Sequence, residues 1–346
     1  MIPGLMLSKR VIAAPAAVGG SLCNTAAAAV DCRVRFRQPG WRRYFKQSFV
    51  RTGDGVHLAV YDSGPRVAEH TVLFLHGLCL DHTWWEGQIA YLSRRYGRSV
   101  RVICYDHRGH GGSTAAPMHT YRIDQLADDL ARVLETLEVT GPLTLVGHSM
   151  GGMTALAYMG RPTAQRPVEA HGLVLIATAA GKLAERGLAR LLATPATAAL
   201  VGLVEHTPEY ARRSLTAPVR AALSRWRGHG RGAGVAATIV AALATTSVTT
   251  AVGFLPGLRA YNQYATLGSI RARTVVISGG ADPLTPPSHA ADLAAGIRGA
   301  ERVHVAYAGH MLADEVPSVI NEAIGRTIKA RCAADTVSPH RLGCVG

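Results

Sequence analysis

The stretch LTLVGHSMGGMTALAY, residues 143–158, decides the fold. A run of apolar and β-branched residues opens it and predicts a buried strand, and helix formers close it. Between them, GHSMG fits the pattern G-x-S-x-G, which places a serine on a tight turn from a strand into a helix. Gly147 and Gly151 are required because side chains there would collide with neighbouring backbone. The turn therefore exposes the Ser149 hydroxyl above a sheet edge, at a helix N-terminus whose free N–H groups favour a developing negative charge.

A serine hydroxyl is a weak nucleophile at neutral pH and needs a neighbouring base. Of the 15 histidines in the chain, His310 in YAGHM follows the last predicted strand, where a loop can reach over the sheet edge. Asp282 in SGGADP follows another strand, at the same edge as Ser149, and can fix the tautomer of the base. The order Ser149, Asp282, His310 is the one expected for a serine on this kind of turn. We therefore predict that these three residues form a catalytic triad.

Other polar residues near this edge give weaker candidates. Asp106, which ends a strand in the loop DHRGHG, remains an alternative for the triad acid. His148 adjoins the nucleophile and is predicted to be structural or part of the pocket wall. His107 and His110 could bind a metal, but no third ligand stands at a suitable spacing, so no metal site is predicted. Three further acids are predicted to lie on helix surfaces: Asp128, Asp129 and Asp314.

Hydrolysis by a serine also needs donors for the oxyanion of the intermediate. HGL, residues 76–78, follows the strand predicted over residues 72–75. Gly77 permits a close backbone approach, so the N–H of Leu78 can point at a substrate oxygen. The N–H of Met150 is the second predicted donor. Each such donor is typically worth about 2.7–4 kcal/mol in the transition state.

The rest of the chain continues the alternation of strands and helices. A hairpin is predicted around TGDG, between strands over residues 49–51 and 56–62. Further strands are predicted over residues 72–75, 100–105, 143–147, 173–177, 274–278 and 303–305, and helices over residues 84–96, 121–138 and 150–159. Continuous apolar strands that alternate with helices predict an α/β fold, with a mostly parallel sheet of about eight strands and helices on both faces.

The alternation stops between residues 180 and 267, which are rich in Ala, Leu and Arg and predict a helical cap inserted over the sheet. The core is then expected over residues 48–179 and 268–331, with an N-terminal extension (1–47) and a C-terminal tail (332–346). Residues 232–258 contain no charge. We interpret this part of the cap as a helix that lines an acyl site, and a membrane span is the alternative.

Five motifs together suggest a family. LFLHGL, YDHRGHGGS, GHSMGG, SGGADPLTP and AGHM resemble, in order and spacing, those of the α/β-hydrolase superfamily, over residues 48–331. Two of them are similar to the forms found in monoacylglycerol lipases, carboxylesterases and related peroxidases. The resemblance implies the α/β-hydrolase fold and two-step acyl transfer through an acyl-enzyme, with no cofactor and no metal.

The substrate expected from these features is a small ester, lipid-like if the apolar cap lines the acyl site. Three other uses of the same triad stay open: thioesterase, C–C bond hydrolase and cofactor-free perhydrolase. A hydrolase-like binding protein without activity is a further alternative, although a binding protein would not need all three triad members.

Composition and charge limit the partners and the location. The formal net charge is +14, but no zinc-finger spacing or interleaved aromatic and basic module accompanies it, so no nucleic-acid partner is expected. The basic cluster from Arg33 to Lys46 predicts contact with anionic lipid headgroups. The uncharged residues 11–30 resemble a weak signal or anchor, yet the basic cluster after them disfavours export. The six cysteines form no C-x-x-C pair. The sequence favours a cytoplasmic or peripheral-membrane location.

Overall fold

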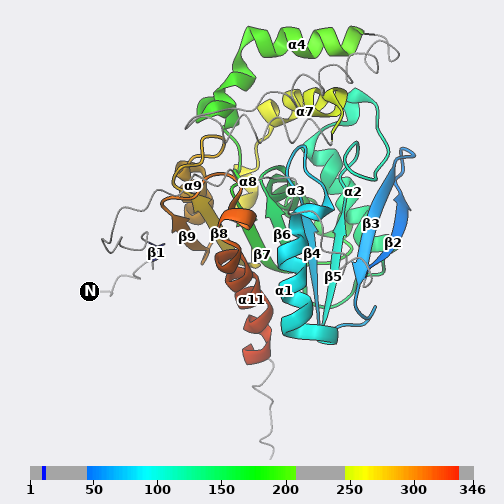
Figure 1. Ribbon diagram of the computed structural model, residues 1–346, viewed down its shortest axis with the longest axis vertical. Coiled ribbons are helices and arrows are strands. Elements are labelled where there is room, and N and C mark those ends of the chain that lie inside the picture. The colour runs from blue at the N-terminus through cyan, green and yellow to red at the C-terminus, as the bar shows by residue number, and fades with distance from the viewer. Residues whose placement is uncertain (1–9, 13–44, 208–245, 335–346) are drawn as a thin grey trace, which may run out of the picture.

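The computed structural model describes residues 10–12, 45–207 and 246–334 of the chain. Within these ranges one nine-stranded sheet runs through the molecule in the order β1-β9-β8-β7-β6-β4-β5-β3-β2 (Figure 1). Its strands are β1 (Arg10–Ile12), β2 (Lys46–Arg51), β3 (His57–Ser63), β4 (His70–Leu75), β5 (Val100–Tyr105), β6 (Leu143–His148), β7 (Ala170–Ile176), β8 (Arg273–Gly279) and β9 (Glu301–Val305). Among these strands, β2 pairs antiparallel with β3, and β3 pairs antiparallel with β5; the other pairs are parallel.

The predicted mostly parallel sheet is confirmed, with one strand more than expected. Strands β2 to β9 correspond to the eight predicted ones, and β5 has the predicted bounds. The additional strand, β1, lies in the segment interpreted as an extension and pairs parallel with β9, Arg10 opposite Val303. Three residues without alternating polarity carry no strand signal of their own, so the sequence could not reveal it.

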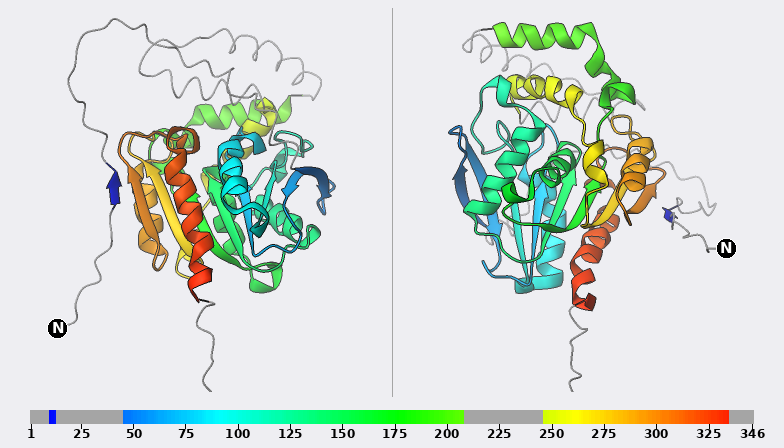
Figure 2. Two further views of the ribbon diagram at one scale, coloured as in Figure 1. Left: turned by 60° about the horizontal axis from the view of Figure 1, so that its bottom comes forward. Right: turned by 180° about the vertical axis from the view of Figure 1, so that it is seen from behind.

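Helices cover both faces of the sheet (Figure 1 and Figure 2). One face carries α1 (Glu86–Tyr96), α10 (Leu312–Glu315) and α11 (Pro317–Ala334), and the other carries α2 (Ile123–Thr136), α3 (Met150–Met159), α8 (Tyr264–Leu267) and α9 (Pro287–Gly296). Because successive side chains of a strand point to opposite faces of the sheet, the central strands contribute side chains to two hydrophobic cores. In β6, for example, Leu145 belongs to the core beneath α2 and α3, and Val146 to the core beneath α1 and α11.

Two more helices, α4 (Pro195–His206) and α7 (Val248–Ala260), lie one above the other over one edge of the sheet (Figure 1). This is the carboxyl edge, because Thr250 of α7 packs on Gly109 in the loop that follows β5. They belong to the predicted cap, of which residues 208–245 lie outside the described part. The uncharged stretch 232–258 is described only from residue 246, and the basic cluster from Arg33 to Lys46 only in its last two residues. Among the helices described, none combines the length and apolarity that a bilayer crossing requires.

One acid predicted to be exposed is buried instead. Asp129 of α2 is 1% exposed and accepts two hydrogen bonds of 2.7 Å from Arg108, which also donates to Asp54 at 2.8 Å. The prediction of a surface position was wrong because the partner stands 21 residues away in a loop, where helical periodicity gives no sign of it. Arg108 thereby ties the β2–β3 turn and α2 to the loop after β5, which borders the candidate site.

Candidate active site

Ser149 alone forms the turn between β6 and α3. Its backbone has φ 52° and ψ −117°, a conformation that is strained for any residue other than glycine. A Cβ on Gly147 would stand 2.6 Å from the carbonyl oxygen of Gly151, and a Cβ on Gly151 would stand 2.1 Å from that of Leu75. The chain can therefore pass from strand to helix here only with glycine at both positions. Such strain clusters at functional sites, where the surrounding structure holds it.

The end of β7 holds this turn in place. The Ser149 amide donates to the carbonyl of Ile176 at 2.9 Å, and the Thr178 hydroxyl donates to the carbonyl of Ser149 at 2.7 Å. Thr178 also fills the space beside Gly152, where a Cβ would meet its side chain at 2.7 Å. No local sequence signal points to Thr178, because its role depends on the pairing of β6 with β7.

His310 and Asp282 are in direct contact, although they follow different strands. His310 Nδ1 donates to Asp282 Oδ2 at 2.8 Å. Three more donors converge on this carboxylate: the Leu284 and Thr285 amides at 2.8 and 3.0 Å, and the Thr285 hydroxyl at 2.7 Å. Burial alone would raise the pKa of Asp282, but the hydrogen bonds from His310 and Thr285 outweigh it and leave the pKa below its usual value. The carboxylate thus stays charged and fixes His310 as the Nδ1–H tautomer, with Nε2 as an acceptor.

Thr285 was not singled out in the sequence. It stands three residues after Asp282, in the order Asp-Pro-Leu-Thr, and a hydroxyl at this spacing can bond back to the acid that opens the turn. The same hydroxyl lies 3.4 Å from His310 Nδ1. The sequence therefore indicates that Thr285 can bond to Asp282 within the turn, but it does not indicate that Thr285 also lies beside the His310 ring.

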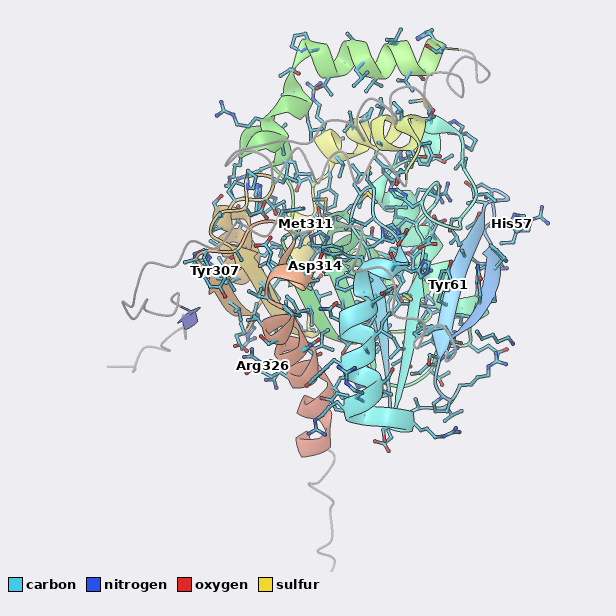
Figure 3. All side chains as sticks on the ribbon, viewed as in Figure 1. His57, Tyr61, Tyr307, Met311, Asp314 and Arg326 are labelled. Atoms are coloured by element: carbon cyan, nitrogen blue, oxygen red, sulfur yellow. The ribbon has the colours of Figure 1, made fainter. Side chains whose placement is uncertain are left out.

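His148 joins the His310 loop to the Ser149 turn. Its Nε2 donates to the carbonyl of His310 at 2.9 Å, and the two rings lie 5.0 Å apart, centroid to centroid. Burial and the nearby His310 lower the pKa of His148 to about 3, so the ring is neutral. The loop itself joins β9 to α10, and the neighbours Tyr307 and Met311 mark it in Figure 3.

The three predicted triad residues are not equally connected. Asp282 and His310 are bonded, and the carbonyl of His310 accepts a hydrogen bond from His148, the residue before Ser149. Within the described part of the chain, no hydrogen bond joins the Ser149 hydroxyl to the His310 ring. Catalytic hydrogen bonds of this kind are often loose without substrate and tighten when it binds.

The two predicted oxyanion donors flank the same turn. A Cβ on Gly77 would lie 3.3 Å from Ser149 Cβ and 2.9 Å from His148 Nδ1, so the HGL loop rests directly on the turn. Neither the Leu78 nor the Met150 amide has a hydrogen-bond acceptor among the residues that the structure describes. The described residues therefore leave both N–H groups without an acceptor, as the predicted oxyanion role requires.

Asp106, the alternative acid, is committed elsewhere. It accepts from the amide and the Nδ1 of His82 at 2.7 and 2.9 Å and from the Gly112 amide at 2.8 Å. Tyr61, labelled in Figure 3, stacks on the His82 ring with 3.6 Å between centroids. Since His310 Nδ1 is bonded to Asp282, the geometry favours Asp282 over Asp106 as the acid that pairs with His310.

The histidines of the DHRGHG loop are also accounted for. Both ring nitrogens of His110 are hydrogen-bonded to backbone, and His107 is buried with neither ring nitrogen paired among the described residues. No cluster of three metal-ligand side chains occurs in the described ranges. A shallow hollow beside Val139 and His171 borders the start of β6, at the opposite edge from Ser149, and takes no part in this site.

Known proteins resemble this chain in sequence and in fold. A family model described as alpha/beta hydrolase fold matches residues 70–317. The chain is 32% identical over 180 residues to a 3-oxoadipate enol-lactonase of Acinetobacter baylyi, covering 48% of this chain and 62% of that protein. It is 38% identical over 113 residues to a bifunctional esterase/perhydrolase of Acinetobacter calcoaceticus, covering 33% and 39%. Both matches thus span less than two thirds of the relative's length. The fold is similar to that of a hydrolase from Pseudomonas aeruginosa, with a TM-score of 0.61, 26% identity and coverage of 82% and 98%.

Proposed function

Because the chain belongs to the alpha/beta hydrolase fold family, we propose that it is a serine hydrolase that cleaves carboxylic esters through an acyl-enzyme. The observation that carries the proposal is the arrangement at the carboxyl edge: the Asp282–His310 pair is tied by His148 to the strained turn of Ser149. Few structural roles would require a strained serine, a buried carboxylate and an oriented imidazole at one place.

The reaction follows from these groups. Ser149 Oγ attacks the ester carbonyl carbon while His310 Nε2 takes its proton, and the Leu78 and Met150 amides donate to the resulting oxyanion. When the tetrahedral intermediate collapses, the bond to the alcohol oxygen breaks and Nε2 returns the proton to that oxygen. Water then attacks the acyl-enzyme with the same assistance and releases the acid. Asp282 holds the tautomer and balances the imidazolium cation in both steps.

The surroundings of the oxyanion donors favour an apolar acyl group. Leu78 packs against the core cluster that includes Met153 of α3 and Phe254 of α7. The Leu78 side chain is therefore continuous with an apolar core that extends from the sheet to the cap helix. An apolar pocket with a few directed polar groups is the usual form of a small-molecule site.

A panel of p-nitrophenyl esters with acyl chains from two to sixteen carbons tests this proposal. We expect turnover by the parent protein, none above background by Ser149→Ala, and a preference for medium or long chains. Equal turnover by Ser149→Ala and the parent would contradict the assigned nucleophile. A preference for acetate over all longer esters would contradict the apolar acyl site while leaving the mechanism intact.

A perhydrolase is the second candidate, favoured by the similarity to the bifunctional esterase/perhydrolase. In that reaction hydrogen peroxide replaces water in the second step, attacks the acyl-enzyme and leaves as a peracid. Peracid formation from ethyl acetate and hydrogen peroxide, measured by bromide oxidation, distinguishes the two. The perhydrolase proposal fails if peroxide yields only the carboxylic acid.

A further inference from the structure

The loop that carries the Leu78 amide is a tight turn with a strained residue in it. The Leu80 amide donates to the carbonyl of Gly77 at 3.2 Å, which closes a four-residue turn over residues 77–80. Its third residue, Cys79, has φ 62°. Turns with positive φ at this position favour glycine, because a side chain there is crowded against the backbone. An interaction outside the turn must therefore help to hold Cys79 in this conformation.

Two buried histidines hold the peptide units on either side of Leu78. His76 Nδ1 donates to the carbonyl of Gly77 at 2.8 Å, and His110 Nε2 accepts from the amide of Cys79 at 3.0 Å. The Gly77 carbonyl belongs to the same planar peptide as the Leu78 N–H, and the Cys79 amide belongs to the next one. Together the two bonds fix the backbone rotations about the Leu78 Cα, and hence the direction of its N–H group.

The hydrogen bonds of His110 define the tautomer in which it accepts from the Cys79 amide. Its Nδ1 donates to the carbonyl of Arg108 at 3.0 Å, so Nε2 must be the unprotonated nitrogen that accepts from Cys79. Burial lowers the pKa of His110 to about 3, so the acceptor is retained throughout the neutral range. The ring lies 5.8 Å from that of Phe254, centroid to centroid, so the cap helix α7 closes over it.

We propose that His110 is a positioning residue for the oxyanion hole: through the Cys79 amide it holds the turn that aims the Leu78 N–H. His110 touches no reacting atom in this account. Its side chain instead stabilises a backbone conformation that Cys79 would leave if the acceptor were lost. The inference rests on the proposed function, since it assigns a role within the same acyl-transfer site.

Replacement of His110 by Phe and by Gln tests the inference. Phe keeps a ring but removes the acceptor, whereas Gln offers an amide oxygen at a similar reach. We expect His110→Phe to lower kcat at least tenfold with KM changed less than about threefold, because a misdirected donor weakens transition-state binding. Affinity for an alkyl boronic acid, whose adduct with Ser149 carries an oxyanion, should fall in parallel. His110→Gln should recover part of both losses.

Two further variants separate this role from general stability. Adding Cys79→Gly to His110→Phe should restore part of kcat, because glycine holds positive φ without help. His70→Phe is the matched control. His70 is a buried histidine bonded to Thr144 at the amino ends of β4 and β6, far from Ser149, so its loss should lower stability but not kcat. If His110→Phe does not fold, His110→Gln carries the test of the acceptor, and Cys79→Val tests whether the strained turn controls kcat, since a β-branched residue resists positive φ.

A readout without turnover makes failure of the inference distinct from failure of the proposed function. Amide hydrogen exchange in a peptide that contains Cys79 should be faster in His110→Phe than in the parent, and unchanged in His70→Phe. Unchanged exchange, or a parental kcat in His110→Phe while Ser149→Ala is inactive, would overturn the inference. Exchange that changes as expected in a protein that hydrolyses no ester would keep the hydrogen bond and refute only the proposed function.

Discussion

His310 Nδ1 lies 2.8 Å from Asp282 Oδ2, although 28 residues separate the two along the chain. The contact exists because β8 and β9 are parallel neighbours, so the loops after them leave the sheet side by side. Each loop also brings its own support: Thr285 donates to the carboxylate, and His148 donates to the carbonyl of His310. The acid–base pair is therefore in place before any substrate binds.

Replacement of the acid should impair the chemical step. In Asp282→Asn the side-chain amide can donate to Nδ1 and stabilise the wrong tautomer of His310. We expect kcat for a p-nitrophenyl ester to fall roughly 10⁴-fold, the size seen for this substitution in a serine protease triad. Asp106→Asn is the matched control, because Asp106 is bonded to His82. A larger loss of kcat in Asp106→Asn than in Asp282→Asn would refute the assignment.

The Ser149 turn should not tolerate a side chain at Gly151. In Gly151→Ala the new Cβ would stand 2.1 Å from a carbonyl oxygen of β4, so backbone must move. We expect a loss of several kcal/mol in the free energy of unfolding, or no folded protein. In Gly87→Ala, near the start of α1, no atom lies within 4 Å of the new Cβ, and stability should change by less than about 1 kcal/mol. Urea denaturation of both variants makes the comparison, and a folded, active Gly151→Ala would contradict it.

The ion pair beneath the loop after β5 should matter more than a surface pair on the same helix. Asp129→Ala leaves Arg108 buried with part of its compensation gone, and we expect a loss of about 3–5 kcal/mol. Glu135→Ala removes an exposed partner of Arg132 and should cost less than about 1 kcal/mol. Denaturant midpoints give both values. Equal losses in the two variants would contradict the expectation that burial makes the Asp129–Arg108 pair contribute more to the free energy of unfolding.

Stability should decrease as the pH falls below about 6.5. Burial lowers the pKa of several histidines below the usual value. Among them are His76, His107, His110 and His148, and the pKa of the last two falls to about 3. Above about pH 6.5 these residues are neutral in both states. Below it the unfolded chain takes up protons that the folded protein cannot, so each contributes a loss of up to about 1.4 kcal/mol per pH unit until its own folded-state pKa is reached, which is about 3 for His110 and His148.

His107→Leu isolates one of these contributions. Neither ring nitrogen makes a well-formed hydrogen bond among the described residues, although the ring lies near the backbone of His76, so the change removes a titrating group at little cost in hydrogen bonding. The fall of unfolding free energy between pH 6.5 and 5, measured by urea denaturation, should be shallower than in the parent. Tyr105→Phe is the control. It removes a buried hydroxyl from the ring that contacts His107, but it does not change the number of protons that the chain takes up in acid. Identical slopes in His107→Leu and the parent would contradict the prediction.

The sequence predicted what depends on local pattern. The mainly apolar stretch of β5, interrupted only by Arg101, predicted both of its ends. The two glycines around Ser149 predicted the turn because only glycine fits there. The helix expected from residue 84 begins as an α-helix at Glu86, after a short 3-10 turn capped by Asp81. Caps and single turns are set by individual hydrogen bonds, so periodicity places helix ends only approximately.

What the sequence could not predict depends on contacts between distant segments. Asp129 carries no sign of its buried partner Arg108, and β1 is a strand only because β9 offers it an edge. The support that His110 gives to Cys79 spans 31 residues and passes through backbone atoms, which no motif records. Motifs identify which residues can do chemistry, and the tertiary structure determines which others hold them in position.

The most direct test of the account is the site of covalent reaction with an alkyl fluorophosphonate. The parent protein should gain one phosphonyl group, and peptide mass spectrometry should place it on Ser149. His310→Ala should react at least a hundredfold more slowly, because the serine then lacks its base. A folded parent protein that gains no adduct, or gains it on a residue other than Ser149, would contradict the claim that this turn presents the nucleophile.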